Sequence, residues 1–397
     1  MTDLLLRDAL LWHPGSAGDS LTDVLIRAGR VAAVGPGLEA GDVPVEGLGG
    51  RLLLPGFVDA HAHVDKTLWG GPWVPHDAGP GLQGKIRNGV EARPALGLPN
   101  PGYITALLQQ MVACGTTHAR THVDVDTAMG LAAVHAVREA VARLDGRITV
   151  DLVAFPQAGL LTAPGTAELM DAALAEGADL VGGIDPAGLE NDPVAHLDVV
   201  FGLAGKHGAG VDIHLHDGGP LGVWQYELII ERARALGMRG KVTISHGFAL
   251  GEAAPAVQER VIAGLAEAGV SLATVAPAAA APLPLVALRE AGVPVGAGND
   301  GVRDLWSPYG DGDMLERALF LAQRGRFVRD EEIEIALEAA TLGGARVTGR
   351  RAGFAPGDPG DFAAVPARTA AEAVCVRPVR SLVVKGGRVV ARDGRLV

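Results

Sequence analysis

The feature that most constrains the fold of this chain is a unit that repeats eight times between residues 55 and 346. Each unit has a short apolar run, a polar residue near its end and a helical stretch, such as 127–143 or 258–268. Near-continuous apolar runs are typical of parallel strands that are buried on both faces. Their alternation with helices indicates βαβ units. The eight runs are 57–65, 116–124, 148–157, 179–185, 211–217, 242–246, 270–277 and 293–300.

Eight such units in about 290 residues predict an α/β fold, the (β/α)8 or TIM-like barrel, whose usual size is about 250 residues. An open, doubly wound sheet is the structural alternative, but it rarely needs eight even repeats. Residues 1–54 and 347–397 instead contain short strand-like runs that glycine and proline interrupt. We therefore predict two domains, a barrel at 55–346 and a small β-sandwich formed from 1–54 and 347–397.

The composition excludes several classes of partner. The 397 residues include 34 Lys plus Arg against 46 Asp plus Glu, a formal charge of −12. Because an acidic surface repels phosphate backbones, we expect no nucleic acid polymer as a partner. No run approaches the ~20 apolar residues that span a bilayer, and the start lacks a signal-peptide pattern, so we expect no membrane partner. The two cysteines imply no disulfide framework, and a reducing, cytoplasmic location is expected.

In a (β/α)8 barrel the active site lies at the carboxyl ends of the strands. The first predicted strand ends in His61 and His63, and residues two apart on a strand point in the same direction. Both imidazoles can therefore reach one point. Polar groups at buried strand tips are costly unless they are paired, so their recurrence at the later tips needs an explanation. The later tip residues are His122, Gln157, Asp185, His214, His216, His246 and Asp300.

His61, His63, His214 and Asp300 are the predicted ligands of one divalent metal ion. Imidazole nitrogens together with a carboxylate oxygen suit Zn(II) or Fe(II). A single histidine is more often a hydrogen-bonded core residue than a ligand, but the whole set at strand tips favours a metal site. Some metal barrels hold two ions bridged by a carboxylated lysine on the fourth strand. Neither the third nor the fourth run contains lysine, so we expect one ion.

Such an ion can lower the pKa of a bound water to near ~7, which makes hydroxide available at neutral pH. Asp300 is then placed both to bind the metal and to accept the proton of that water. His246 is expected to orient the water or to stabilise the negative charge that develops on the substrate. A further group must protonate the leaving nitrogen, and His216 and Asp217 are the candidates. The His216 side chain points in the same direction as that of His214, whereas Asp217 is the first residue of the loop. His216 is therefore favoured as the acid that protonates the leaving nitrogen.

Five segments carry a resemblance to a known family: HAHVDK at 61–66, GTTHARTHVD at 115–124, AFPQ at 154–157, SH at 245–246, and GND at 298–300 followed by Trp306. They resemble the amidohydrolase superfamily and, within it, the cytosine deaminase branch, over nearly the whole chain. The resemblance implies a metal-dependent hydrolase that acts on C–N bonds of small nitrogen heterocycles such as pyrimidines or triazines. Subunit contacts are common in such barrels, so a homo-oligomer is expected.

One segment departs from cytosine deaminases, which carry His-Cys-Asp-Glu on the fifth strand with the glutamate as proton shuttle. Residues 214–217 are His-Leu-His-Asp here, so cytosine itself is disfavoured as the substrate. The segment is more similar to a triazine-ring enzyme of the same branch. That similarity implies that His216 and Lys66 are catalytic or contact the substrate, and that Asp185 meets the ring. Asp217 can replace the glutamate only if the substrate binds deeper, because its side chain is one methylene shorter.

Three further residues are assigned to substrate binding. Gln157 can hydrogen-bond the amide edge of a ring or cap a loop, and Trp306 can stack on a ring or pack beneath a loop. His122 is expected to lie deeper in the barrel and to hydrogen-bond a neighbouring tip group. The connection 67–113 is long for a βα unit, and we expect it to be a lid or a subunit contact.

The sequence therefore predicts a metal-dependent amidohydrolase that releases ammonia or an alkylamine from a pyrimidine- or triazine-like ring. The nearest alternative is a hydrolase that opens a cyclic amide or ureide with the same metal site. A catalytically silent assembly or binding protein is a second alternative, which the presence of all four predicted ligands disfavours.

Overall fold

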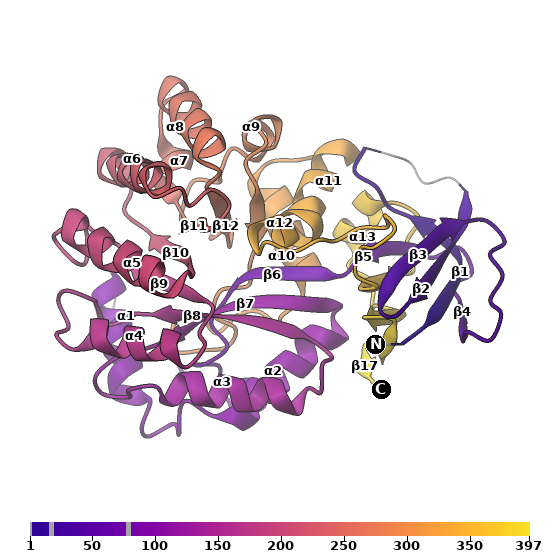
Figure 1. The fold of residues 1–397 in the computed structure, drawn as a ribbon, viewed down its shortest axis with the longest axis horizontal. Coiled ribbons are helices and arrows are strands. Elements are labelled where there is room, and N and C mark those ends of the chain that lie inside the picture. The colour runs from indigo at the N-terminus through magenta and orange to yellow at the C-terminus, as the bar shows by residue number, and fades with distance from the viewer. Residues whose placement is uncertain (1, 16–19, 77–80) are drawn as a thin grey trace.

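The computed structural model describes residues 2–15, 20–76 and 81–397. One of its sheets has eight parallel strands that follow one another in chain order (Figure 1). An isolated parallel bridge between Ala62 and Asp300 joins the first strand to the segment after the last one. The predicted (β/α)8 barrel is thereby confirmed. Its strands are β6 (Phe57–Ala62), β7 (Thr116–Asp124), β8 (Thr149–Phe155), β9 (Leu180–Ile184), β10 (Gly210–Leu215), β11 (Val242–His246), β12 (Ser271–Thr274) and β13 (Val295–Ala297).

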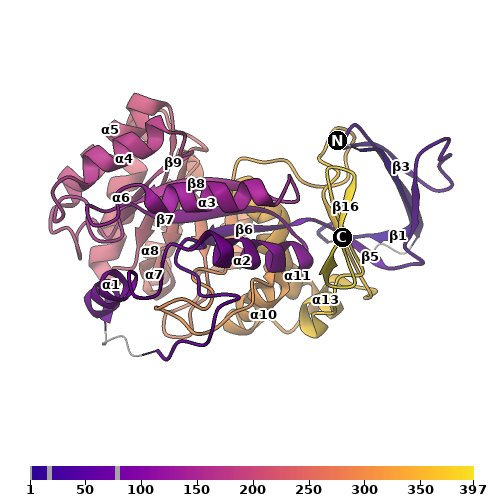
Figure 2. The ribbon, with the colours of Figure 1, turned by 90° about the horizontal axis from the view of Figure 1, so that it is seen from below.

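Helices connect these strands and cover the outside of the barrel (Figures 1 and 2). Most strand residues are buried, as expected for strands between an outer helical layer and a filled interior. Among the described residues, no helix combines the length and apolar character needed to cross a membrane. The helices are α1 (Gly81–Ala92), α2 (Pro101–Ala113), α3 (Ala132–Arg143), α4 (Thr166–Ala175), α5 (Pro193–His207), α6 (Gly219–Ala235), α7 (Phe248–Glu252), α8 (Pro255–Ala268), α9 (Leu285–Glu290), α10 (Met314–Arg324), α11 (Asp330–Glu338), the π-helix η1 (Ala339–Gly343), α12 (Gly344–Val347) and α13 (Ala370–Val376).

The barrel closes where the segment around β13 approaches β6. A Cβ at Gly298 would lie 2.4 Å from the carbonyl oxygen of His61, a distance that only a glycine can accommodate. The backbone N–H of Asp300 donates to the carbonyl of His61 at 2.9 Å, and the N–H of His63 donates to the carbonyl of Asp300 at 3.2 Å. The closure therefore fixes Asp300 beside the two histidines of the first strand.

The two chain ends pair into a second, nine-stranded sheet at one end of the molecule (Figure 2). Strand β5 runs antiparallel to β14, which joins the N-terminal strands to the C-terminal ones in one continuous sheet. Its own hydrophobic core, separate from that of the barrel, contains Leu6, Ile26, Phe354 and Phe362. The domain boundaries stay a prediction. The strands are β1 (Leu4–Leu11), β2 (Leu21–Arg27), β3 (Arg30–Gly35), β4 (Val45–Gly47), β5 (Leu52–Pro55), β14 (Phe362–Val365), β15 (Leu382–Lys385), β16 (Arg388–Arg392) and β17 (Arg395–Leu396).

Several local elements differ from the sequence prediction. The helix expected at 127–143 begins only at Ala132, because the side chain of Asp126 accepts hydrogen bonds from two following backbone N–H groups and forms a turn. Helix α13, which Thr369 caps at its N-terminus, was not predicted in the C-terminal segment. The connection 67–113 contains the two helices α1 and α2, and its residues 77–80 lie outside the described part of the chain.

Phe362→Ala should destabilise the protein by about 3–5 kcal/mol, because it removes a fully buried ring from the core of the small sheet. The ring of Phe362 stacks on that of Phe354 with 5.1 Å between centroids. Urea unfolding followed by circular dichroism measures the loss. The control Val328→Ala, at a side chain that is 83% exposed, should change stability by less than about 0.5 kcal/mol. Equal stability of the two variants would contradict a separate packed core in this sheet.

Candidate functional site

The four predicted metal ligands converge at the carboxyl end of the barrel. His63 Nε2 lies 3.1 Å from His214 Nε2 across the strand tips. Asp300 Oδ1 lies 3.4 Å from His63 Nε2 and 3.8 Å from His61 Nε2. Three strand ends that are far apart in the sequence therefore deliver nitrogen and oxygen donors to one place.

Two further histidines adjoin this cluster. His122 is fully buried, and it can offer a ring nitrogen within 4.8 Å of those of His61, His63 and His214. His246 can do the same together with His61 and Asp300. His122 lies deep in the barrel as expected, with Nε2 3.4 Å from Asp212 Oδ1, but the predicted hydrogen bond to a tip group is absent, because neither ring nitrogen has a hydrogen-bond partner among the described residues. The site therefore holds more nitrogen donors than the sequence prediction assigned to the metal.

The four histidines described next are neutral at neutral pH, the protonation state in which an imidazole can bind a metal ion. Burial lowers the pKa of His61, His63, His214 and His246 well below the usual range, so their rings are neutral at neutral pH. Buried polar atoms are costly without partners. Yet His61 Nε2, His214 Nδ1 and both ring nitrogens of His246 find no hydrogen-bond partner among the described residues. Neutral, unpaired imidazole nitrogens beside one carboxylate fit a divalent metal ion.

A hydrogen-bonded chain behind the cluster sets the tautomer of His61. Its Nδ1 lies 2.9 Å from Ser245 Oγ, and the Ser245 hydroxyl donates to Asp212 Oδ1 at 2.6 Å. Because that hydroxyl proton is engaged by Asp212, Ser245 accepts from His61 Nδ1, which leaves Nε2 with its lone pair toward the cluster. Arg120 Nη1 in turn donates to Asp212 Oδ2 at 3.1 Å.

Sequence reasoning missed Asp212 and Arg120. Burial would raise the pKa of Asp212, but the neighbouring His122 and Arg120 outweigh it and hold the carboxyl ionised. A signal was present, because Asp212 lies two residues before His214 and so shares its direction on β10. The interpretation of that strand considered only the residues at its tip.

Three of the predicted site residues have left-handed backbone conformations. Asp185, His246 and Asp300 have φ values of 33°, 68° and 62°. Such conformations cost of order 1–3 kcal/mol for a residue other than glycine, and they cluster at functional sites. Each follows or ends a barrel strand, so the chain turns sharply there and its side chain stays at the strand tip.

The structure separates the two candidates for the leaving-group acid. His216 Nδ1 lies 2.7 Å from Asp185 Oδ2, and the His216 backbone N–H donates to Asp185 Oδ1 at 2.6 Å. Burial alone would lower the pKa of His216, but the hydrogen bond and charge of Asp185 outweigh it and raise that pKa. The carboxylate of Asp217 instead accepts from the Gly188 N–H and from Gln225 Nε2, each at 2.8 Å. Both candidates line a cavity of about 490 Å³.

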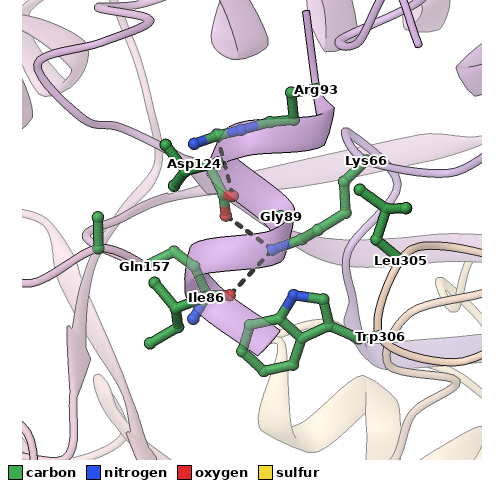
Figure 3. A pocket seen from close by; sticks show the side chains of 10 residues that line it. Lys66, Ile86, Gly89, Arg93, Asp124, Gln157, Leu305 and Trp306 are labelled. Carbon is green, nitrogen blue, oxygen red and sulfur yellow. Dashed lines mark hydrogen bonds and ion pairs between the residues drawn. The ribbon is translucent and has the colours of Figure 1, made fainter. Parts of the chain in front are cut away.

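Lys66, Gln157 and Trp306 come together in a neighbouring small pocket of about 20 Å³ (Figure 3). Lys66 Nζ donates to Gln157 Oε1 at 3.0 Å and lies 5.6 Å from the centre of the Trp306 ring. Helix α1, within the segment predicted to be a lid, supplies part of the wall through Ile86 and Gly89, and Arg93, the residue after the helix, adds to it. Sequence reasoning did not assign Phe155, whose ring stacks on that of His214 with 4.1 Å between centroids.

Comparisons with known proteins agree with this geometry. A family model described as "Amidohydrolase family" matches residues 100–391. N-isopropylammelide isopropyl amidohydrolase of Pseudomonas sp. (strain ADP) is 31% identical over 408 residues, which cover 100% of this chain and 98% of that protein.

Two solved structures extend the comparison. N-isopropylammelide isopropylaminohydrolase from Burkholderia multivorans ATCC 17616 is 46% identical, with a TM-score of 0.95 and 100% of both chains covered. 5-methylcytosine deaminase from Klebsiella pneumoniae, liganded with 5-fluorocytosine, is 25% identical, with a TM-score of 0.83 over 98% of this chain and 97% of that chain. The resemblance seen in the sequence is confirmed.

Ser245→Ala should weaken the binding of Zn(II) about 10- to 100-fold, because it removes the group that orients His61. Competition with a chromophoric chelator measures the affinity. The matched control is Ser271→Ala on the next strand, β12, which is also buried and should leave the affinity unchanged. Equal affinity in the wild type and both variants would contradict the role of Ser245.

Proposed function

Because the chain belongs to the amidohydrolase family, we propose that it hydrolyses a small nitrogen heterocycle and releases ammonia or an alkylamine from it. The observation that carries the proposal is the convergence of His61, His63, His214 and Asp300 next to His216, whose pKa the hydrogen bond and charge of Asp185 raise. The identity to N-isopropylammelide isopropylaminohydrolase supports a triazine or pyrimidine ring as the substrate class. The cytoplasmic location and the homo-oligomeric state stay predictions.

We propose one divalent ion, Zn(II) or Fe(II), held by those four residues. When bound, it supplies a water molecule that ionises near neutral pH. The single-ion proposal is supported by the position of Lys66, whose ammonium group is occupied by Asp124 and Gln157 and so does not bridge two ions. His122 is proposed to support the cluster from below and not to touch the substrate, since it is fully buried.

The protein groups then divide the proton transfers. Asp300 accepts the proton of the attacking water through its carboxylate, which lies beside His63. His246, neutral and with both ring nitrogens free of partners among the described residues, stabilises charge on the ring that is attacked. His216 donates a proton to the leaving nitrogen from Nε2, because Asp185 holds its Nδ1.

The activity is tested by mass-spectrometric detection of released ammonia or alkylamine from the metal-loaded enzyme. The panel contains cytosine, isocytosine and N-alkylamino triazines, with creatinine and cyclic ureides as ring-opening substrates. We expect amine release from an aminated ring, with N-alkylamino triazines the best substrates. Products that gain water without losing an amine would show a ring-opening hydrolase, and no turnover by the metal-loaded protein would favour a silent relative.

His216→Gln should lower kcat at least about 100-fold on the best substrate of that panel, because the leaving nitrogen loses its acid. Asp217→Asn should lower it less than about threefold, since Asp217 is engaged by Gly188 and Gln225. Steady-state kinetics on protein with equal metal content make the comparison. The reverse ranking of the two variants would move the acid role to Asp217.

A further inference from the structure

A tyrosine that the proposed proton transfers do not use contacts the turn that carries His246. Tyr226 belongs to helix α6, which packs against the short helix α7 (Figure 1), and its side chain is fully buried. Its hydroxyl donates a hydrogen bond at 2.9 Å to the carbonyl of Gly247, the residue after His246. Burial raises the pKa of this hydroxyl, so it stays protonated and can donate at neutral pH.

The ring of His246 is not held by hydrogen bonds of its own. Neither ring nitrogen has a hydrogen-bond partner among the described residues. The ring lies among other rings, with its centroid 4.3 Å from that of His216 and 5.5 Å from that of Phe248. The backbone of His246 and the packing around it therefore determine where the ring points.

That backbone is in an unfavourable conformation. His246 and Gly247 are two consecutive left-handed residues, with φ values of 68° and 58°. For a residue with a Cβ, such a conformation persists only where its surroundings hold it. What contacts the peptide groups on either side of Gly247 therefore decides whether His246 keeps its place.

The peptide groups of Gly247 are held from two directions. Its N–H donates to the carbonyl of Leu215, at the end of β10, at 3.0 Å. Its carbonyl accepts from the Leu250 N–H at 3.1 Å, within the turn of helix that follows, and from Tyr226. A Cβ at Gly247 would overlap the Tyr226 hydroxyl, so this close approach requires a glycine. Tyr226 thus ties the turn to a separate helix.

Gln225, the residue before Tyr226, makes comparable contacts to two other loops at the strand tips. It is fully buried, accepts from the Ala187 N–H at 3.0 Å and donates to the carboxylate of Asp217 at 2.8 Å. Ala187 follows β9 and Asp217 follows β10, so two consecutive residues of α6 reach the loops after three strands. A side chain that only filled the core would need no polar group there, which supports a positioning role for this turn of α6.

We propose that Tyr226 is a positioning residue for His246: its hydroxyl holds the turn after β11 so that the ring keeps its place beside His61 and Asp300. The inference rests on the proposed function, in which His246 stabilises charge on the ring that is attacked. Such stabilisation depends on a group that is already in place when the charge develops. Loss of the hydroxyl should therefore slow the reaction and leave the binding of substrate and metal nearly unchanged.

Tyr226→Phe tests the proposal, because it removes the hydroxyl and keeps the packing of the ring. Steady-state kinetics of the zinc-loaded enzyme, with the best substrate of the panel, should show kcat lowered about 10-fold and KM changed less than about twofold. Competition with a chromophoric chelator should show the wild-type affinity for Zn(II). The matched control, Tyr103→Phe, makes the same chemical change on helix α2, outside the residues assigned to the site, and should leave kcat and KM unchanged.

A double-mutant cycle with His246→Ala separates the positioning of His246 from a general loss of structure. If the hydroxyl acts through His246, Tyr226→Phe should lower kcat less than about twofold once the imidazole is absent. An equal loss of kcat in both backgrounds, a wild-type kcat in Tyr226→Phe, or a similar loss in Tyr103→Phe would overturn the proposal.

A second measurement does not depend on turnover. The chain has twelve histidines, and in zinc-loaded protein labelled with ¹³C-histidine the NMR signal of His246 is identified by its loss in His246→Ala. Tyr226→Phe should move that signal further than any other histidine signal, and Tyr103→Phe should leave it in place. An unmoved His246 signal, or a larger shift of another histidine, would overturn the proposal, also where the His246→Ala enzyme is too slow for the kinetic cycle.

Failure of this inference is distinguishable from failure of the proposed function. Amine release by the wild type, with the kcat and the His246 signal unchanged in Tyr226→Phe, would overturn only the role of Tyr226. A displaced His246 signal in a protein that releases no amine from any ring of the panel would overturn the proposed reaction and leave Tyr226 as the residue that positions His246.

Discussion

The structure depends on the burial of neutral histidines at the ends of the barrel strands. Burial disfavours the charged imidazolium, so each of the rings of His61, His63 and His214 keeps one nitrogen with a lone pair that can bind a metal ion. Their nitrogens meet beside the carboxylate of Asp300, where a set of unpaired polar atoms would be costly in the absence of a cation. The helical layer and the closure of the barrel keep these groups out of water. The burial that stabilises the fold is therefore also what keeps the metal-binding imidazoles neutral.

The parts of the structure that could be predicted are those that follow from the alternation of side chains along a strand and from the repeated strand–helix unit. Strand residues two apart share a direction, and the carboxyl ends of parallel strands meet on one face. Those two rules were enough to place His61, His63 and His214 together with Asp300 from the sequence. Lys66 was assigned to the site because it follows the first strand directly, and it does line a pocket there.

The rest depended on contacts that no periodicity describes. Arg93, the residue after helix α1, forms an ion pair with Asp126, and loop length alone does not indicate where such a helix lies. The late start of α3 comes from local side-chain hydrogen bonds of Asp126. The carboxylate of Asp217 accepts a hydrogen bond from the Gly188 N–H. Gly188 follows the neighbouring strand, so the sequence of 214–217 alone could not show that Asp217 and His216 have different partners.

The central claim is that three histidines and one aspartate hold a single divalent ion at the strand tips. X-ray absorption spectroscopy at the edge of the bound metal, on freshly purified protein with measured stoichiometry, tests it most directly. The account predicts one ion per chain, with nitrogen and oxygen neighbours near 2.0–2.2 Å if the ion is zinc, and with scattering from imidazole rings. A second metal at about 3.5–4 Å, sulfur in the coordination shell, or protein that binds no metal would contradict it.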